Sequence, residues 1–476
     1  MLGKQQLVLD AATWLKGMSS GSEIPDGGFS DETEAVNLSV DPGVVYAPAA
    51  QVNGDGDVIL DDEIIASCPD AQASSPNDRL VMTDDGDFMR YNGTKLLDVT
   101  GGQDATRTYG KGSSDMVAWF GEVYFTSQEN LGRWQTATDT FNFTFFAFAN
   151  TAAHPPHELL VFENNLYISD GNVLYRMTEV GGSVQSILTL GVNEYITALG
   201  IEPETGKMVI ATTYGQNYSS TINKINKVLW YDGLSDKPYR IIQVQEMVTA
   251  FHNHQGQLFV GYGLNIGALT GTGIQFLRRL TFATLAGTDL PYKQNFASIG
   301  RIMFIIDGSR ILAFGSIIAG SPSVWWHFFT NLNNSNVFQC IFNAGNNKLG
   351  FSFATATPVF RTISITSVAG LDELDFYINW IIFPRPVRIK SVDIHFNSAI
   401  TSSANYNISY YDQSSASAIT SSLASMHGTQ TSVTQLLDIV GFTTPLWALK
   451  LRINVTTGSE ANAGIRRIII YYDFFE

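Results

Sequence analysis

The chain is poor in cysteine, and this shortage excludes a disulfide framework. Only two cysteines, Cys68 and Cys340, occur in 476 residues, and they lie far apart in the sequence. Small domains that depend on disulfides carry several cysteines at short spacings. We therefore expect two unpaired thiols.

Charged residues are also scarce, and those of positive sign most of all. Asp, Glu, Lys and Arg make up 15% of the chain, and the formal net charge is −16. Proteins that grip nucleic-acid phosphates need a basic stripe, so tight binding of nucleic acid is not expected. The low charge leaves two interpretations open: a neutral polar surface, or a subunit that is largely covered by its neighbours in an assembly.

Long apolar runs are missing. No stretch reaches the roughly 20 apolar residues that a transmembrane helix needs, and the longest run, residues 376–384, indicates a buried strand. The apolar run at residues 7–9 is interrupted by Asp10 and follows no basic region, so no signal peptide is expected. These absences predict a protein that is made in a cytoplasm and does not insert into a membrane.

Motifs for catalysis are missing as well. The chain contains no phosphate-binding loop, nucleophile elbow or dinucleotide fingerprint. The nearest match to the Ser-x-Asp-x-Gly-x-x-Trp box of sialidases spans residues 127–134, where Glu129 stands for Asp and Gly132 comes one position late. Because this match is not repeated, we interpret it as a hairpin turn, and we predict neither enzymatic activity nor a cofactor.

What the sequence does contain is a repeated apolar hairpin pattern. Seven copies follow one another at steps of about 42 to 50 residues, which is the spacing of β-propeller blades. In the third copy, apolar residues 159–162 and 166–168 flank Glu163-Asn164-Asn165, whose asparagines tolerate the positive φ of a tight hairpin. The prediction is an all-β chain with a β-propeller of about seven blades at residues 41–365.

The segment before the repeats, residues 1–40, has a different character. Apolar side chains at positions 7, 11, 14 and 15 predict one short amphipathic helix over residues 5–16. The stretch that follows is rich in turn formers and predicts an extended arm that ties one subunit to its neighbour, with a flexible tail as the alternative. The residues assigned to this assembly arm are Trp14, Ile24, Pro25, Gly27, Gly28 and Phe29.

The segment after the repeats, residues 366–476, alternates apolar and polar residues over stretches such as 387–396 and 447–455. Period-two strands separated by loops rich in Ser, Thr and Gly predict an antiparallel β-sandwich of jelly-roll type. The Ser- and Ala-rich stretch 413–422 is interpreted as a surface loop. We therefore predict three parts: an arm, a propeller and a sandwich.

Two groups of residues have the chemistry of metal ligands. Asn53, Asp55 and Asp57 place oxygen atoms at alternate positions, as calcium loops do, but the places where an EF-hand needs Gly and Glu hold Val58 and Ile64. A calcium site of another type and a solvated turn both remain open there. The histidine pairs at 154/157 and 252/254 have no third ligand nearby in sequence, so we interpret them as polar loop residues and predict no bound metal.

The order of these parts resembles a known family. An arm with Gly27-Gly28-Phe29 leads to Val36-Asn37-Leu38 and Asp41-Pro42-Gly43-Val44, and a propeller and a sandwich follow. In this organisation the chain is similar to tail and neck structural proteins of tailed bacteriophages, including propeller-containing tail-nozzle proteins. The resemblance implies a virion protein of the tail that forms a homo-oligomeric ring. The ring would dock other tail or neck proteins, and tail fibres are among the candidates. It would surround or cap the DNA path without binding DNA tightly.

Two other functions remain open. A host-receptor module would bind cell-surface glycan on exposed aromatic platforms, for which the candidates are Trp134, Trp230 and Trp447. A propeller glycosidase would need two carboxylates a few ångströms apart in the central funnel. The acidic clusters at residues 55–63 and 84–87 both lie in turn-like stretches, so solvated turns are the simpler interpretation.

Overall fold

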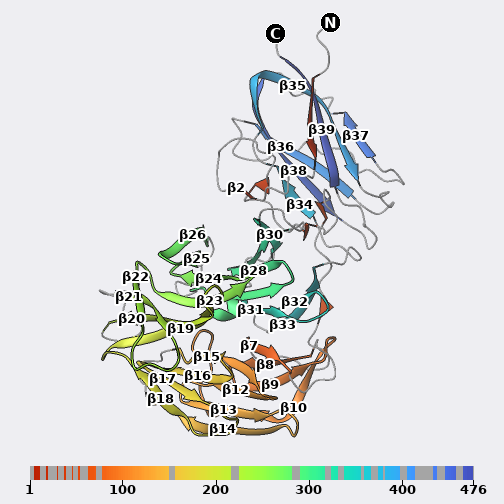
Figure 1. Ribbon diagram of the computed structural model, residues 1–476. Helices are drawn as coiled ribbons and strands as arrows, with labels where there is room; N and C mark the ends of the chain where they lie inside the picture. The colour runs from red at the N-terminus through yellow and green to blue at the C-terminus, as the bar shows by residue number, and fades with distance from the viewer. Residues whose placement is uncertain are drawn as a thin grey trace.

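The computed structural model is built of β-strands. The residues that it describes are 5–10, 18–19, 29–30, 37–38, 45–46, 52–53, 63–70, 78–149, 156–215, 225–280, 290–316, 323–330, 337–354, 359–365, 374–378, 381–396, 405–412, 432–436, 445–456 and 465–474. Within these ranges the strands form seven four-stranded antiparallel sheets, one nine-stranded arrangement and one two-stranded pair. The all-β prediction is therefore confirmed (Figure 1).

The seven four-stranded sheets are the blades of a β-propeller, numbered here in chain order. Blade one contains β7 (Ile64–Pro69), β8 (Arg79–Thr83), β9 (Asp87–Tyr91) and β10 (Leu96–Gln103). Blade two contains β11 (Met116–Trp119), β12 (Glu122–Thr126), β13 (Asn130–Gln135) and β14 (Thr140–Ala147). Blade three contains β15 (Leu159–Phe162), β16 (Asn165–Asp170), β17 (Val173–Met177) and β18 (Gln185–Thr189).

The remaining four blades follow the same plan. Blade four contains β19 (Glu194–Glu202), β20 (Lys207–Tyr214), β21 (Ile225–Tyr231) and β22 (Arg240–Val244). Blade five contains β23 (Val248–His254), β24 (Gln257–Tyr262), β25 (Asn265–Thr270) and β26 (Gly273–Arg279). Blade six contains β27 (Phe296–Ile299), β28 (Ile302–Asp307), β29 (Arg310–Gly315) and β30 (Val324–Thr330), and the 3₁₀ turn η2 (Lys293–Asn295) precedes it.

Blade seven closes the ring with a strand from the other end of the propeller. Its first three strands are β31 (Val337–Asn343), β32 (Lys348–Ala354) and β33 (Val359–Ser364), and its fourth is β6 (Val52–Asn53), which precedes blade one in the chain. Because β6 is covalently continuous with blade one, its antiparallel pairing with β33 joins the two ends of the propeller. The predicted number of about seven blades is confirmed among the described residues.

The hairpins form where the sequence permits positive φ. Glu163 and Asn164 have φ of 47° and 64° and join β15 to β16, with Phe162 paired to Asn165. This is the two-residue turn that suits the right-handed twist of the flanking strands. The sequence pattern therefore set the register that places Leu166 and Ile168 in the core.

Aromatic side chains fill the spaces between blades. The ring centroid of Phe88 in blade one lies 4.4 Å from that of Phe125 and 6.1 Å from that of Trp134, both in blade two. Tyr91 and Phe360 pack in the same way across the junction of blades one and seven, with centroids 5.3 Å apart. Each sheet thus buries both faces against its neighbours, which a single blade cannot do.

Buried hydroxyl groups also link neighbouring blades. At four of the seven junctions a buried Ser or Thr donates a hydrogen bond to a backbone carbonyl in the first strand of the next blade or in the segment that leads into it. These bonds run from Thr126 to the oxygen of His157 (2.9 Å), from Thr197 to that of Val248 (2.6 Å), from Thr249 to that of Pro291 (3.2 Å) and from Ser352 to that of Ile64 (3.1 Å). They fix the inner strands relative to one another.

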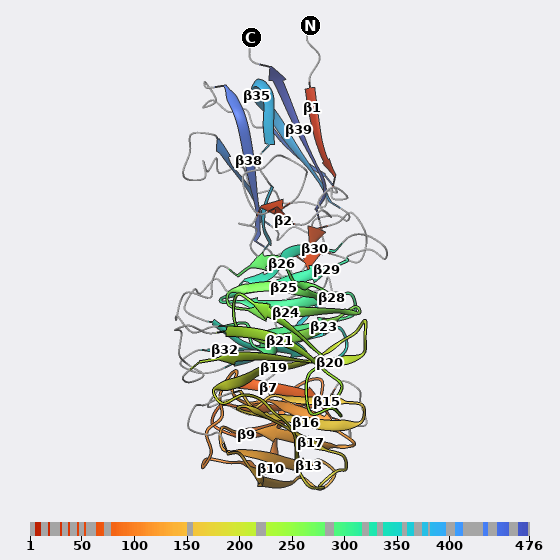
Figure 2. The same ribbon diagram turned by 60° about the vertical axis from the view of Figure 1, so that its left-hand side comes forward.

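The C-terminal strands form a separate module above the propeller (Figure 1, Figure 2). Its strands are β34 (Leu374–Tyr377), β35 (Ile381–Phe396), β36 (Asn405–Asp412), β37 (Ser432–Leu436), β38 (Leu446–Thr456) and β39 (Ile465–Phe474). Three short pieces of the N-terminal segment, β1 (Gln5–Asp10), β4 (Asn37–Leu38) and β5 (Val45–Tyr46), join the same arrangement, whereas β2 (Met18–Ser19) and β3 (Phe29–Ser30) pair only with each other.

Strand β35 pairs with more than one strand of this module. It pairs with β38 through Ile381, Ile382 and Val387, with a register shift between Ile382 and Val387, and it pairs with β39 from Val387 onward. Pro384 and Pro386 lie within this register shift. Proline has no N–H to donate to a ladder, so the two prolines interrupt the pairing of β35 with β38.

The predicted helix at residues 5–16 is wrong over its described part. Residues 5–10 form β1, which pairs antiparallel with β39 so that Leu7 lies opposite Ile470 and Leu9 opposite Ile468. A short apolar run has no fixed preference between helix and strand. Here it becomes a strand because it can pair with the open edge of the isoleucine-rich β39. The start of the N-terminal segment is therefore bound to the C-terminal end of the same chain.

The hydroxyl links make a testable contribution to stability. We expect Thr197→Val to lower the free energy of unfolding by about 1–3 kcal/mol. Valine has nearly the shape of threonine but no hydroxyl group, so the buried carbonyl oxygen that accepts the hydrogen bond of Thr197 loses its donor. The matched control is Thr140→Val, at an exposed position of β14, which should change stability by less than about 0.5 kcal/mol. Equal effects of the two substitutions in urea unfolding would contradict the link.

Candidate axial site

The turn η2 reaches from blade six to the far side of the ring. The Lys293 ammonium donates to Asp115 Oδ2 at 2.5 Å and to the carbonyl oxygen of Leu159 at 3.1 Å. The neighbouring Gln294 donates from Nε2 to the carbonyl oxygen of Ser114 at 2.9 Å. Blades two and three are each three blades away from blade six around the ring, so η2 crosses the propeller axis.

Asp115 is the acceptor on which these contacts converge. Its Oδ1 accepts from the N–H of Met116 at 2.9 Å, and its Oδ2 accepts from the N–H of Leu159 at 2.9 Å as well as from Lys293. The carboxylate, which is buried, therefore holds the first residues of two inner strands, β11 and β15, to the turn before blade six. Charge-assisted hydrogen bonds of this kind are about twice as strong as neutral ones.

Glu158 is the second carboxyl group at the axis. It is buried directly before β15, and its N–H donates to Ser169 Oγ at 2.8 Å. Burial and the neighbouring charge of Asp115, partly offset by Lys293, raise the pKa of Glu158 to about 8. Burial lowers the pKa of the Lys293 ammonium, but Asp115 and Glu158 outweigh this, so its pKa is raised overall. At neutral pH the cluster is an ion pair beside a largely protonated Glu158.

The two histidines of β23 converge on one serine. His252 Nε2 lies 2.7 Å and His254 Nδ1 lies 2.9 Å from Ser298 Oγ in blade six. Burial, with smaller contributions from His254 and Lys293, lowers the pKa of His252 to about 3. These histidines therefore join blades five and six as neutral hydrogen-bonding groups, rather than lying in polar loops as the sequence suggested.

The histidine pair at 154/157 is represented by its second member, since His154 lies outside the described residues. His157 is buried, and each of its ring nitrogens lies 3.1 Å from a backbone carbonyl oxygen, that of Ser169 or that of Gln128. Its ring stacks on Phe148 with centroids 3.9 Å apart. Where the structure describes the chain, no group of three or more His, Cys, Asp and Glu side chains is placed to hold a metal ion.

A cavity of about 350 Å³ adjoins η2 on the axis, and both cysteines line it. Cys68 lies on β7 and Cys340 on β31, and both thiols are free and buried, so the prediction of two unpaired thiols is confirmed. Burial raises the pKa of Cys340 to about 12 and raises that of Cys68 further. Both thiols are therefore protonated at neutral pH and inert as nucleophiles.

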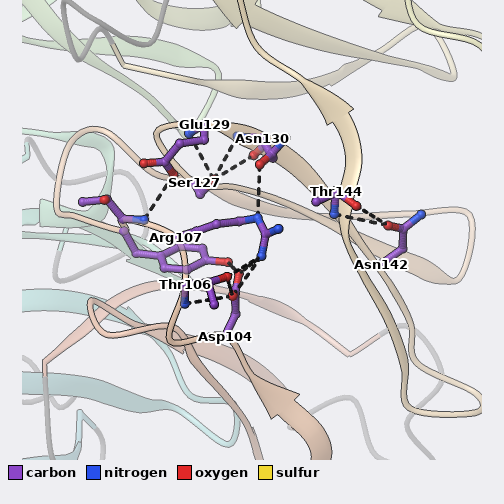
Figure 3. A network of polar contacts seen from close by, with 10 residues as sticks. Asp104, Thr106, Arg107, Ser127, Glu129, Asn130, Asn142 and Thr144 are labelled. Atoms are coloured by element: carbon purple, nitrogen blue, oxygen red, sulfur yellow. Dashed lines mark hydrogen bonds and ion pairs between the residues drawn. The ribbon is translucent and has the colours of Figure 1, made fainter.

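The sialidase-like stretch at residues 127–134 begins with the turn between β12 and β13, residues 127–129, and continues into β13 (Figure 3). Ser127 Oγ accepts from the N–H groups of Glu129 and Asn130 and so fixes the turn. Nearby, Asp104 binds Thr106 and Arg107 in the connection from blade one to blade two. Both networks hold loops in place, which agrees with the interpretation of this stretch as a turn.

Of the three tryptophans predicted as glycan platforms, two are buried. Trp134 and Trp230 are both 0% exposed, so the prediction is wrong for them. Their indole N–H groups donate to Asp139 and Glu202 inside the propeller. A large ring whose polar edge finds a partner packs well in a core. Trp447 is 51% exposed on β38 and remains available as a platform.

Most other candidates fall outside the described residues. Of the calcium candidates, Asn53 lies in β6, whereas Asp55 and Asp57 are not described. Of the assembly arm, Phe29 lies in β3, paired in parallel with Met18 of β2. The others, Trp14, Ile24, Pro25, Gly27 and Gly28, lie outside the described residues.

The axial carboxylates were not singled out from the sequence, although the repeat contains a signal for them. Glu63, Asp115 and Glu158 each stand directly before the first strand of a blade. Alignment of the first three repeats would have placed these acids at one level around the axis. Nothing in the sequence indicates that Lys293 would reach them, because the ion pair joins residues 178 positions apart.

Comparisons with known proteins add little to this description. No family model matches the chain, and no curated protein matches it. Among solved structures, the crystal structure of BamB from Moraxella catarrhalis is similar with a TM-score of 0.38 and 12% sequence identity, over 71% of this chain and 95% of that chain. The propeller fold rests on the seven sheets themselves. Among the described residues no helix is long and apolar enough to cross a membrane.

The protonated state of Glu158 predicts a pH dependence. Its pKa rises from an ordinary 4.5 to about 8 on folding, so its stabilising contribution is complete below pH 4.5 and is lost as pH rises through 8. We expect the wild type to lose stability relative to Glu158→Gln between about pH 5 and pH 8, by up to about 1.4 kcal/mol per pH unit. Urea unfolding at several pH values measures this difference.

The control is Glu204→Gln, an exposed carboxyl group in the turn after β19. It should leave the pH profile unchanged. Parallel profiles for the wild type and Glu158→Gln would contradict the protonated state.

Proposed function

We propose that this chain is a structural subunit of the tail or neck of a tailed bacteriophage. In this proposal, copies of the chain form a ring that surrounds or caps the DNA path and docks other tail proteins. The order of arm, propeller and C-terminal module supports the family resemblance, and the low charge suits a subunit with much of its surface covered. The observation that carries the proposal is an apolar patch on the outside of the propeller.

This rim patch consists of Tyr239, Ile241 and Phe276, which are 56%, 58% and 57% exposed. Ile241 lies on β22 with Tyr239 directly before it, and Phe276 lies on β26; these are the outermost strands of blades four and five, and they contact each other (Figure 1). Large apolar side chains that gather on a surface mark sites of protein association. The rim patch is therefore the surface that we assign to contacts between subunits.

The axial contacts support an assembly role over catalysis. A glycosidase needs two carboxyl groups that are free to reach a substrate. Here Asp115 accepts three hydrogen bonds from the protein, and Lys293 lies across the axis beside Glu158. The Asp115 carboxylate holds blades two and three to the turn before blade six. DNA would then pass through the centre of the ring of subunits, where a net charge of −16 on each chain would repel it and keep it mobile.

Glycan recognition is a second candidate, and the exposure of Trp447 favours it. Ile382, which is 54% exposed, pairs with Ala448 next to Trp447, so two large apolar side chains lie on neighbouring strands of the C-terminal module. Flat exposed aromatic rings suit the apolar faces of sugars. This surface would serve host attachment within the same virion protein.

Native mass spectrometry of the purified chain tests the assembly proposal. We expect a closed homo-oligomer, and we expect Ile241→Asp combined with Phe276→Asp to weaken association at least about tenfold, because it places charge in an apolar interface. The control is Leu97→Asp, at a half-exposed apolar position of blade one, which should leave the oligomer intact. A wild-type monomer in every condition would contradict the proposal.

The glycan candidate has its own test. If Trp447 is a platform, Trp447→Ala should abolish binding on a glycan array, whereas Tyr239→Ala on the propeller rim should leave it unchanged. Loss of a stacking ring removes most of a weak affinity. A wild-type protein that binds no glycan, or equal binding by the wild type and Trp447→Ala, would exclude this surface.

A further inference from the structure

The axial cavity is lined by two side chains that each carry an atom without a hydrogen-bond partner. Its volume of about 350 Å³ falls in the range of small-molecule pockets, and blades one, two, five, six and seven all contribute to its wall. The two side chains are His252 on β23 and Gln294 in η2, and the atoms without a partner among the described residues are Nδ1 and Oε1. What these atoms can bind determines the ligand of the cavity.

The hydrogen bonds around Ser298 fix the position of the ring hydrogen in His254. A hydroxyl group has one hydrogen, so Ser298 Oγ can donate to only one of the two histidines that it contacts. Burial lowers the pKa of His254, and the backbone carbonyl of Arg301, which accepts a hydrogen bond from its ring, opposes this. The neutral ring of His254 therefore carries its hydrogen on Nε2, and its Nδ1 accepts the hydrogen of Ser298.

The same bonds make His252 Nδ1 an acceptor. Because the hydrogen of Ser298 is directed at His254, Ser298 Oγ accepts from His252 Nε2, which lies 2.7 Å away. The neutral ring of His252 has only this one hydrogen, so its Nδ1 is left with a lone pair. None of the described residues donates to that lone pair.

Gln294 Oε1 is the second acceptor. Gln294 Nε2 donates to the carbonyl oxygen of Ser114 at 2.9 Å, and because a carbonyl can only accept, this bond fixes the orientation of the amide. Oε1 is buried without a hydrogen-bond partner among the described residues. A buried acceptor without a donor is costly, so the wall is prepared for a ligand that donates.

The charge state of His252 indicates that the donor is neutral. A proton on Nδ1 would be a positive charge, and burial, with smaller contributions from His254 and Lys293, lowers the pKa of His252 to about 3. A cationic ligand at the same atom would meet the same burial and the same Lys293 ammonium. A hydroxyl group donates without bringing a charge.

We propose that the axial cavity binds a small neutral polyol, with one hydroxyl group donating to His252 Nδ1 and a second donating to Gln294 Oε1. Its carbon skeleton would lie against the apolar part of the wall, which includes Met116, Phe296 and Phe342. The site does not depend on the assembly of subunits, because all of its walls come from one propeller.

Saturation-transfer NMR of the full chain at pH 7 tests the ligand class, with cyclohexanediols as probes. The affinities of the 1,2-, 1,3- and 1,4-diols would be compared with that of cyclohexanone, which has the same ring and accepts hydrogen bonds but does not donate them. We expect the best diol to bind at least about tenfold more tightly, because its two hydroxyl groups supply the missing donors. Cyclohexylamine, which donates but is a cation, should bind no better than cyclohexanone.

The ring nitrogens of His252 report the contact directly. In protein with ¹⁵N-labelled histidine rings, the signal of the bare Nδ1 is assigned by its absence from His252→Phe. We expect this signal to move upfield when the best diol binds, because Nδ1 then accepts a hydrogen bond. A diol that binds and leaves the signal in place would overturn the proposal.

Two variants locate the binding. Gln294→Leu and His252→Phe should each reduce the preference for the diol over cyclohexanone about threefold, because each removes one acceptor. The control is Gln257→Leu, the same change at an exposed position of β24, which should keep the preference of the wild type. If one variant fails to fold, the other decides, and if both fail, the wild-type comparison decides.

Four results would contradict the polyol site. They are equal affinities of the wild type for diol and ketone, tighter binding of the amine than of the diol, no binding of any probe, and an unchanged preference in the folded variants.

Discussion

The ion pair between Lys293 and Asp115 is the contact on which the centre of the propeller depends. It joins the turn before blade six to the starts of the inner strands of blades two and three, and the buried carboxylate accepts two backbone N–H groups as well. A buried charge is tolerated only when its partners are in place, so each of these three blades limits the movement of the others.

Closure of the ring provides the second constraint. Every blade must bury two faces, so a gap at any junction would expose two apolar surfaces. The chain prevents this at the last junction by pairing β6 with β33 and by the bond from Ser352 to Ile64. With the junctions between blades closed in this way, the surfaces left for function lie on the rim of blades four and five and on the C-terminal module.

The sequence predicted the local structure of this fold better than its long-range contacts. The period and the turn residues, such as Asn164, indicated the blades because hairpins are encoded by neighbouring residues. The sequence predicts a helix where β1 forms, because the partner β39 lies at the other end of the chain. It predicts exposed platforms at Trp134 and Trp230, since a sequence does not reveal which ring finds a buried acceptor. It does not indicate the role of Lys293 for the same reason, because the partner of Lys293 is fixed only when the ring closes.

A double-mutant cycle tests the central claim most directly, namely that the axial carboxylate serves to hold blades together. The free energy of unfolding would be measured in urea for the wild type, Lys293→Met, Asp115→Asn and the double variant. The account predicts that each single substitution is strongly destabilising and that the two are coupled by about 2 kcal/mol or more, because the loss of Lys293 leaves the Asp115 carboxylate buried without its cation. Additive effects, within about 0.5 kcal/mol, would contradict it.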